Sequence, residues 1–248
     1  YFQETDIIKL FDDCSYYNQM ATTPEQLPRM LQAGMQTAIV RKGVSVIGVP
    51  GDLTIKDAIA SDTSKAIYDS FSETTPANVW VEKLSDMLNK AKRVTIFCGI
   101  GSKDAHDEIV ELSQKLKAPV AYSFKSKMEI QYDNPHEVGM TGLLGMPSGY
   151  RSMHEAEILL LLGTDFPYAS FMPDNNIIVQ VDIKANRIGR RAKVDMGICG
   201  DVKSTLTTLL PHIQTKEDDT FLKRQLEGYK RVKDHLAAYV HIKGEENK

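Results

Sequence analysis

The sequence predicts an α/β fold, in which a Rossmann-like parallel sheet has helices on both faces and follows a partial α/β domain. Short, continuous apolar runs, typical of strands buried on both faces, alternate with segments of helical periodicity. This alternation is the pattern of a parallel sheet covered by helices. The predicted strands are residues 44–49, 94–97, 119–122, 158–162, 177–182 and 196–199.

Local signals place helices around these strands. Asp6 is expected to cap a short helix at 7–11. Thr23, followed by Pro24 at the first helical position, is expected to begin a longer helix that Gly43 ends. The other expected helices lie at about 78–88, 103–117, 148–154, 201–210 and 219–241.

Composition divides the chain into unequal parts. Residues 1–52 form an αβ segment too short to bury both faces of its sheet, so we expect the end of a larger α/β domain. Residues 53–76 lack clear periodicity and are expected to be a linker. A second α/β domain is expected over 77–212, and residues 213–248 are expected to form a connecting polar helix with a solvated tail.

Overall composition excludes several classes of protein. The 248 residues carry a formal net charge of −3, without the basic surplus of nucleic-acid-binding proteins. No apolar stretch approaches the roughly 18 residues that span a bilayer. The three cysteines lie far apart, which indicates reduced thiols and a cytoplasmic protein, and the six histidines lack metal-site spacing. Because the chain opens without Met, we expect a fragment or a processed chain.

Glycines and a hydroxyl group follow the predicted strand at 94–97. The run Gly99-Ile100-Gly101-Ser102 permits a phosphate to approach the backbone, and the next helix supplies N–H groups and the positive end of its dipole. The full GxGxxG motif is absent because position 104 is Asp. The alternative interpretation is a glycine turn without a ligand.

Acids and a glycine-rich loop follow other predicted strands. Asp182, which ends the strand at 177–182, could accept hydrogen bonds from ribose hydroxyls, or could form a helix N-cap or a surface turn. Asp201 could bind adenine or ribose, or could cap the helix that begins near Val202. The loop Thr141-Gly142-Leu143-Leu144-Gly145 could line a pyrophosphate or a flavin, or could be only a flexible connection.

These elements support one another because the carboxyl ends of parallel strands lie along one edge of the sheet, where ligands bind. Together they predict a dinucleotide site. The sequence has no GxSxG elbow and no Cys next to a His, so its residues indicate a cofactor site without an obvious catalytic base.

Five segments carry a resemblance to a known family: Tyr1–Thr5, Asp133–Pro135, Val138–Leu143, Gly163–Tyr168 and Lys193–Met196. In them the chain resembles the thiamin-diphosphate- and FAD-dependent pyruvate oxidases, most closely the quinone-reducing branch, pyruvate dehydrogenase (quinone). The resemblance covers essentially the whole chain. It implies that residues 1–52 end a pyrimidine-binding domain, that 77–212 form a central FAD-binding domain, and that 213–248 lead toward a pyrophosphate-binding domain.

The resemblance implies FAD as the cofactor of this chain, and thiamin diphosphate with Mg²⁺ only in an intact enzyme. The glutamate that activates thiamin would lie upstream of residue 1, and the GDG motif that holds Mg²⁺ would lie beyond Lys248. An intact enzyme of this kind oxidatively decarboxylates pyruvate to acetate and CO₂ and passes electrons through FAD to a quinone. The chain alone is expected to be inactive.

The site residues of the family carry over only onto matching positions. Phe2 and Gln3 match residues beside the reacting thiamin adduct and are the catalytic candidates. The candidates for FAD contact are Thr141, Gly142, Leu143, Leu144, Thr164, Asp165, Phe166, Pro167, Tyr168 and Asp182. Less close matches are Gly99, Gly101, Ser102 and Asp201.

Partners follow from the same resemblance. It implies pyruvate and a quinone as partners of the intact enzyme, and it implies a homotetramer. The intact enzyme would associate peripherally with the inner face of the membrane. No nucleic acid is expected as a partner. Because a truncated first domain would expose apolar surface, we expect this chain to self-associate.

Four alternatives stay open. One is an oxygen-using pyruvate oxidase that forms acetyl phosphate. Another is a relative such as acetolactate synthase, in which FAD is structural; the matches at Phe2-Gln3 and at Phe166-Pro167-Tyr168 argue against it. A regulatory module that holds ADP or NAD, and a folded fragment that retains no ligand, are the other two.

Overall fold

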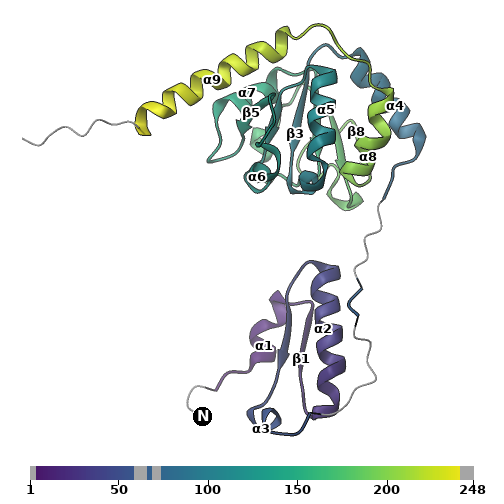
Figure 1. Cartoon of the computed structure of the whole chain (residues 1–248), viewed down its shortest axis with the longest axis vertical. Helices are drawn as coiled ribbons and strands as arrows, with labels where there is room; N and C mark the ends of the chain where they lie inside the picture. The colour runs from purple at the N-terminus through teal and green to yellow at the C-terminus, as the bar shows by residue number, and fades with distance from the viewer. Residues whose placement is uncertain (1–3, 59–65, 69–73, 241–248) are drawn as a thin grey trace, which may run out of the picture. The chain divides into compact units, whose positions relative to one another are not determined.

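The computed structural model describes residues 4–58, 66–68 and 74–240. The chain separates into two compact units, Tyr1–Ser72 and Glu73–Lys248, and each is described by itself (Figure 1). None of the helices in the described residues is long and apolar enough to cross a membrane.

The first unit is a two-stranded parallel sheet whose strands are connected in sequence by a helix. Its elements are α1 (Ile7–Phe11), β1 (Tyr17–Met20), α2 (Leu27–Arg41), β2 (Ser45–Gly48) and α3 (Gly51–Thr54), with 3₁₀ turns at Asp12–Cys14 and Pro24–Gln26. β1 pairs with β2 so that Tyr17 lies opposite Ser45. The sequence does not predict β1, because Tyr-Asn-Gln-Met carries neither an apolar run nor a strict alternation.

The ends of α1 and α2 follow the local signals only in part. Asp6 caps α1 as expected, because its carboxylate accepts a 3.1 Å hydrogen bond from a backbone N–H of the first turn. Thr23 makes no side-chain cap, and Pro24 opens a 3₁₀ turn that precedes α2. The prediction that Gly43 ends α2 is wrong by one residue, because Lys42 itself adopts the left-handed conformation (φ 49°) that closes the helix.

The first unit buries few apolar side chains. Among its described residues, the buried hydrophobic cluster consists of Ala21, Met30 and Leu53. Leu31, Met35 and Ile39 form an apolar stripe at helical spacing on α2, and all three are exposed. A single helix beside two strands offers little to cover this stripe. The described part of this unit therefore presents apolar surface.

The second unit is built on a six-stranded parallel sheet in the order β5-β4-β3-β6-β7-β8. Its strands are β3 (Val94–Cys98), β4 (Val120–Tyr122), β5 (Glu137–Met140), β6 (Ile158–Leu162), β7 (Ile177–Asp182) and β8 (Met196–Cys199). The sequence does not predict β5, because Glu-Val-Gly-Met is short and is not a continuous apolar run.

Helices and turns connect these strands. The helices are α4 (Asn78–Lys90), α5 (His106–Leu116), α6 (Lys127–Ile130), α7 (Pro147–Glu155), α8 (Val202–Leu209) and α9 (Thr220–Val240). The 3₁₀ turns are Ile100–Ala105, Phe124–Ser126, Ala169–Phe171, Ala185–Arg187 and Leu210–His212. A parallel sheet flanked by helices confirms the predicted fold class.

Helices cover the two faces of this sheet in separate apolar layers (Figure 1). Along β3, Ile96 and Cys98 face the layer that contains α4, α5 and α8, whereas Phe97 faces the layer that contains α7 and α9. Successive side chains of a strand point to opposite faces, so a strand buried on both sides needs apolar residues at every position. This is why the strand sequences are continuous apolar runs.

Hydrogen bonds between largely buried side chains hold α9 on the second layer. Glu137 of β5 accepts hydrogen bonds from Tyr122 at 2.6 Å and from Tyr229 of α9 at 2.8 Å. Burial, and then the hydrogen bond to Glu137, raises the pKa of both tyrosine hydroxyls, so both remain protonated donors. Gln225 of α9 also donates a 2.7 Å hydrogen bond to Glu155 of α7.

Candidate functional site

The carboxyl ends of all six strands lie at one edge of the parallel sheet. The chain runs outward from β3 to β4 and β5, and then crosses to the other side of β3 to form β6, β7 and β8. The connections that follow β3 and β6 therefore diverge in opposite directions. In open parallel sheets a crevice forms at such a switch point, and ligands bind there.

Two cavities meet at this switch point. The larger has a volume of about 560 Å³ and lies at the ends of β5, β4, β3 and β6. The smaller has a volume of about 140 Å³ and lies at the ends of β3, β6, β7 and β8. Ile100, Gly163 and Arg187 line both, so the two cavities form one crevice along the sheet edge. The larger cavity falls within the usual size range of ligand sites.

Most of the predicted site residues line this crevice. The larger cavity is lined by Thr141, Gly142, Leu143, Leu144, Thr164, Asp165, Phe166, Pro167 and Tyr168. The smaller cavity is lined by Gly101, Asp182 and Asp201. Gly99 and Ser102 line neither cavity. Phe2 and Gln3 lie outside the described residues, and within the described ranges no three His, Cys, Asp or Glu side chains gather as a metal site.

Three glycines interlock the loops that follow β3 and β6. A Cβ on Gly99 would lie 2.5 Å from Thr164 Cα, and one on Gly101 would lie 2.9 Å from Gly163 Cα. The Gly101 N–H donates a 2.9 Å hydrogen bond to the Gly163 carbonyl, and the Ser102 N–H donates at 3.0 Å to the Gly99 carbonyl. Both N–H groups are therefore used within the protein, as the interpretation of a glycine turn without a ligand requires.

The Thr141–Gly145 loop is a tight turn that borders the larger cavity. The Gly145 N–H donates a 2.8 Å hydrogen bond to the Gly142 carbonyl, and Gly142 has a φ of 132°, which favours glycine. Leu143 and Leu144 are 70% and 79% exposed and line the cavity. The Thr141 hydroxyl is buried without a hydrogen-bond partner in the described structure. The loop thus offers the crevice an apolar wall.

Phe166 and Tyr168 give the same cavity an aromatic wall. Their rings meet edge to face with centroids 5.3 Å apart, and Phe166 packs in the same way on Phe97 of β3 at 5.1 Å. Because Phe166 is buried in the second apolar layer, it fixes the position of this wall. Aromatic and apolar walls suit a planar ring.

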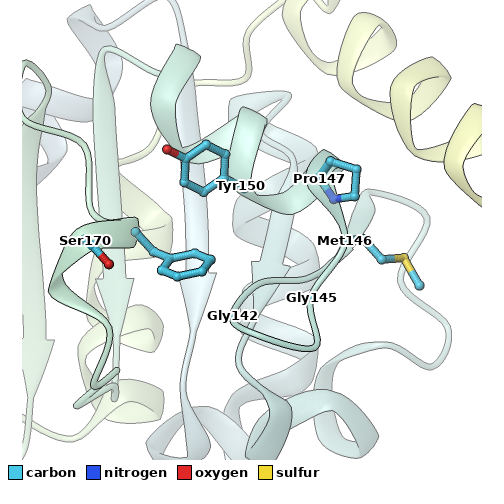
Figure 2. Close-up of a pocket in the computed structure, with 7 residues that line it drawn as sticks. Gly142, Gly145, Met146, Pro147, Tyr150 and Ser170 are labelled. Atoms are coloured by element: carbon cyan, nitrogen blue, oxygen red, sulfur yellow. The ribbon is translucent and has the colours of Figure 1, made fainter.

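The Thr141–Gly145 loop also borders a third cavity of about 450 Å³ (Figure 2). It is lined by Gly142, Gly145, Met146, Pro147, Tyr150, Ser170 and Phe171. The Phe171 ring meets Tyr150 at 5.8 Å and Tyr168 at 5.7 Å between centroids. These aromatic contacts join the walls of the third cavity and of the crevice.

Two acids at the strand ends are already hydrogen-bonded within the chain. Asp182 is buried and accepts a 2.8 Å hydrogen bond from the Lys184 N–H, and burial raises the pKa of its carboxyl. Asp201 accepts a 2.9 Å hydrogen bond from the Ser204 N–H and caps α8. Both acids still line the smaller cavity. Because a carboxylate accepts several hydrogen bonds, these local roles leave each of them able to contact a ligand.

Three arginines that the sequence analysis did not single out surround Asp165. Arg190 donates through Nε at 3.0 Å and also through Nη2, Arg191 lies 3.3 Å away, and Arg187 lies 3.6 Å away. Burial opposes ionisation of Asp165, but the hydrogen bond and charge of Arg190, then the hydrogen bond of Arg191 and the charge of Arg187, hold its pKa below the ordinary value. Arg187, Arg191 and Lys125 line the larger cavity. The signal in the sequence was the basic run that follows β7.

Comparison with known proteins agrees with this architecture. Residues 81–209, more than half of the chain, match the family model of the thiamine pyrophosphate enzyme central domain. The chain is 40% identical, over 95% of its length, to the "Uncharacterized 42.6 kDa protein in isoamylase 3'region" of Pseudomonas amyloderamosa. It is 31% identical, over 90% of its length, to the proposed thiamine pyrophosphate-containing protein YdaP of Bacillus subtilis.

More distant relatives have named activities. The chain is 25% identical, over 96% of its length, to the pyruvate oxidase of Lactiplantibacillus plantarum, and acetolactate synthases match at similar identity. The X-ray structure of a proposed thiamin diphosphate-dependent enzyme from Mycobacterium smegmatis superposes with a TM-score of 0.64, at 19% identity, over 86% of this chain and 42% of that one. This likeness shows the fold.

The chain spans only part of its relatives. It covers 60% of the Pseudomonas protein, 39% of the Bacillus protein and 40% of the pyruvate oxidase. The matched residues 81–209 fall within the second unit, where the six-stranded sheet and its crevice lie. The chain therefore belongs to the thiamine pyrophosphate enzyme family, and its second unit contains the central domain of that family.

Proposed function

We propose that the second unit binds FAD, extended along the crevice with its adenosine in the smaller cavity and its isoalloxazine ring in the larger one. The observation that carries this proposal is the continuity of the two cavities at Ile100, Gly163 and Arg187. One end of the crevice offers carboxylates for sugar hydroxyls, and the other offers apolar and aromatic walls for a planar ring. A flavin dinucleotide likewise has sugar hydroxyls at its adenosine end and a planar ring at its flavin end.

The residues of the crevice fit such a ligand. Asp182, at the end of β7, would accept hydrogen bonds from ribose hydroxyls, while Leu143, Leu144 and Tyr168 would pack against the flavin ring.

For an intact enzyme we propose oxidative decarboxylation of pyruvate to acetate and CO₂, with thiamin diphosphate and Mg²⁺ held by other domains and a quinone as the final acceptor. FAD, when bound, supplies two-electron redox chemistry. The share of this chain is to hold the flavin ring against the aromatic wall and to orient the adenosine through Asp182. Phe2 and Gln3 are proposed to lie beside the substrate. The pyruvate oxidase relative supports this reaction, and the acetolactate synthase relatives support the alternative without net oxidation.

The test compares FAD, FMN, ADP and NAD in equilibrium binding to the purified chain. FAD is expected to bind more tightly than FMN, because FMN lacks the adenosine that would reach Asp182. Asp182→Ala is expected to weaken FAD binding roughly tenfold, because one hydrogen bond to a charged acceptor is lost. The affinity for FMN is expected to stay unchanged.

The matched control is Asp174→Ala, at an exposed acid that precedes β7 and so lies toward the opposite edge of the sheet. It is expected to leave FAD binding unchanged. Binding of ADP or NAD without FAD would favour a regulatory nucleotide module and would contradict the flavin proposal.

A further inference from the structure

The arginine cluster around Asp165 carries more positive charge than this one carboxylate neutralises. Arg190 makes a two-pronged pair, because Nε donates to Oδ1 at 3.0 Å and Nη2 contacts Oδ2. Arg191 Nε donates a longer hydrogen bond to Oδ1, at 3.3 Å, and Arg187 lies 3.6 Å from Oδ2. Bidentate pairing is the strongest arrangement of arginine with a carboxylate. Arg190 therefore balances Asp165, and Arg187 and Arg191 form a surplus of two positive charges.

The two surplus charges face the crevice. Arg187 and Arg191 both line the larger cavity, and Arg187 lines the smaller one as well, whereas Arg190 lines neither. Both side chains are 40% exposed, against 15% for the Asp165 carboxylate. An anion at the junction of the cavities would meet two guanidinium groups beside an acid that is already neutralised.

Two backbone N–H groups beside this junction already have partners within the protein. The N–H groups of Gly101 and Ser102, which the sequence marks as a phosphate loop, donate to carbonyl groups of the protein. The arginine side chains that line the crevice can supply the positive charge that a phosphate needs. Guanidinium groups suit phosphate oxygens because their planar N–H donors match them in pairs.

We propose that Arg187 and Arg191 bind the diphosphate diester of a dinucleotide, and that Arg190 is a positioning residue whose two-pronged pair with Asp165 leaves Arg187 and Arg191 only long contacts with that carboxylate. This inference rests on the proposed function and names the positively charged side chains that would select a ligand with a diphosphate. A diphosphate diester carries two negative charges, which Arg187 and Arg191 can contact with one guanidinium group each. It also joins two organic groups, as the junction at Arg187 joins two cavities.

The first test measures binding of ADP-ribose, a diphosphate diester without a flavin, by isothermal titration calorimetry. Arg187→Gln and Arg191→Gln are each expected to weaken binding about tenfold, since each removes a charge-assisted hydrogen bond to the ligand. Both variants are expected to show a shallower dependence on salt. Arg93→Gln is the matched control, because Arg93 directly precedes β3 and pairs with Glu157, toward the opposite edge of the sheet. Unchanged affinity in both crevice variants overturns the proposal.

The second test separates positioning from direct contact. Arg190→Gln is expected to weaken ADP-ribose at least fivefold, because the unbalanced Asp165 then recruits Arg187 and Arg191. The double variant Asp165→Asn with Arg190→Gln is expected to restore binding to within about threefold, since the competing carboxylate is gone. A purely structural role for Arg190 predicts no rescue, and the absence of rescue overturns the positioning role. Circular dichroism verifies that each variant is folded.

Comparison with FAD distinguishes this inference from the proposed function. If ADP-ribose binds and depends on both arginines while FAD does not bind, the inference stands and the flavin proposal is wrong. If FAD binds equally well to the wild-type chain, Arg187→Gln and Arg191→Gln, the flavin proposal stands and the inference is wrong. Failure of both ligands to bind contradicts both.

Discussion

The hydroxyl of Tyr229 in α9 donates a 2.8 Å hydrogen bond to the carboxylate of Glu137 in β5. β5 is an edge strand of the sheet, and 92 residues separate the two partners along the chain. The bond joins the last described helix to the strand that leads into the Thr141–Gly145 loop. The position of one wall of the crevice is thereby tied to the packing of α9.

Removal of this hydroxyl is expected to destabilise the second unit. Tyr229→Phe leaves a Glu137 oxygen without its donor and is expected to lower the free energy of unfolding by about 1–3 kcal/mol, the usual cost of an unsatisfied buried group. Urea denaturation followed by circular dichroism measures it. Tyr239→Phe, at an exposed tyrosine of the same helix, is the control and is expected to change stability by less than about 0.5 kcal/mol. Equal effects of the two variants would contradict the role of the bond.

Because the loops that follow β3 and β6 are in close contact at Gly163, we expect Gly163→Ala to lower the stability of the protein. A Cβ there would lie 2.6 Å from Gly101, and Gly163 has a φ of 55°. Gly189 also has a positive φ, of 76°, but a Cβ would meet nothing within 4 Å. Gly163→Ala is expected to destabilise the protein by about 1–3 kcal/mol more than Gly189→Ala, the cost of overpacking beyond that of backbone strain. Indistinguishable thermal unfolding of the two variants would show that the loops do not interlock.

Asp182 makes stability depend on pH in a direction that can be checked. Burial raises the pKa of its carboxyl, so the folded state binds a proton more readily than the unfolded state. Between the unfolded and the folded pKa the native state holds more protons, and its stability falls as pH rises through this window. Asp182→Asn removes the titrating carboxyl, so this loss of stability with rising pH does not occur in the variant.

The variant is therefore expected to unfold at higher urea concentration than the wild-type chain at pH 7, and the gain is expected to shrink below the unfolded pKa of about 3.8. A gain that is the same at pH 3 and pH 7 would contradict burial as its cause. Asp174→Asn, at an exposed acid, is expected to show no such pH dependence.

The exposed stripe on α2 predicts self-association. Leu31, Met35 and Ile39 present apolar side chains at helical spacing, and apolar patches of this kind mark association surfaces. Light scattering at micromolar concentration is expected to give a mass above that of one chain. Met35→Lys combined with Ile39→Glu is expected to lower this mass toward the monomer, whereas Met128→Lys, at an exposed methionine of α6 outside this stripe, leaves it unchanged. A monomeric wild-type chain would contradict the prediction.

The central strands could be predicted from the sequence because burial on both faces imposes a continuous apolar run. The predicted bounds 158–162 and 177–182 are those of the central strands β6 and β7, and the predicted bounds 196–199 are those of the edge strand β8. β1 and β5 could not be predicted in this way. β1 reads Tyr-Asn-Gln-Met and β5 reads Glu-Val-Gly-Met, so neither shows a run of apolar residues.

The crevice could be predicted only in outline. Strand-end acids and glycines indicated the correct edge of the sheet, since the topology of a parallel sheet brings such residues together. The use of Gly101 and Ser102 N–H groups inside the protein depends on the β6 loop, which is distant in sequence. The charge surplus of Arg187 and Arg191 depends on Asp165, which precedes them by more than 20 residues and meets them only in the fold.

Binding of FAD in the crevice is tested most directly by the visible absorption spectrum of the purified chain as FAD is titrated into it. We expect a saturable shift of the flavin band, with a dissociation constant of about 1 μM or tighter, which corresponds to about −8 kcal/mol. A flavin spectrum that stays that of free FAD at every protein concentration, in a chain that circular dichroism shows to be folded, would contradict it.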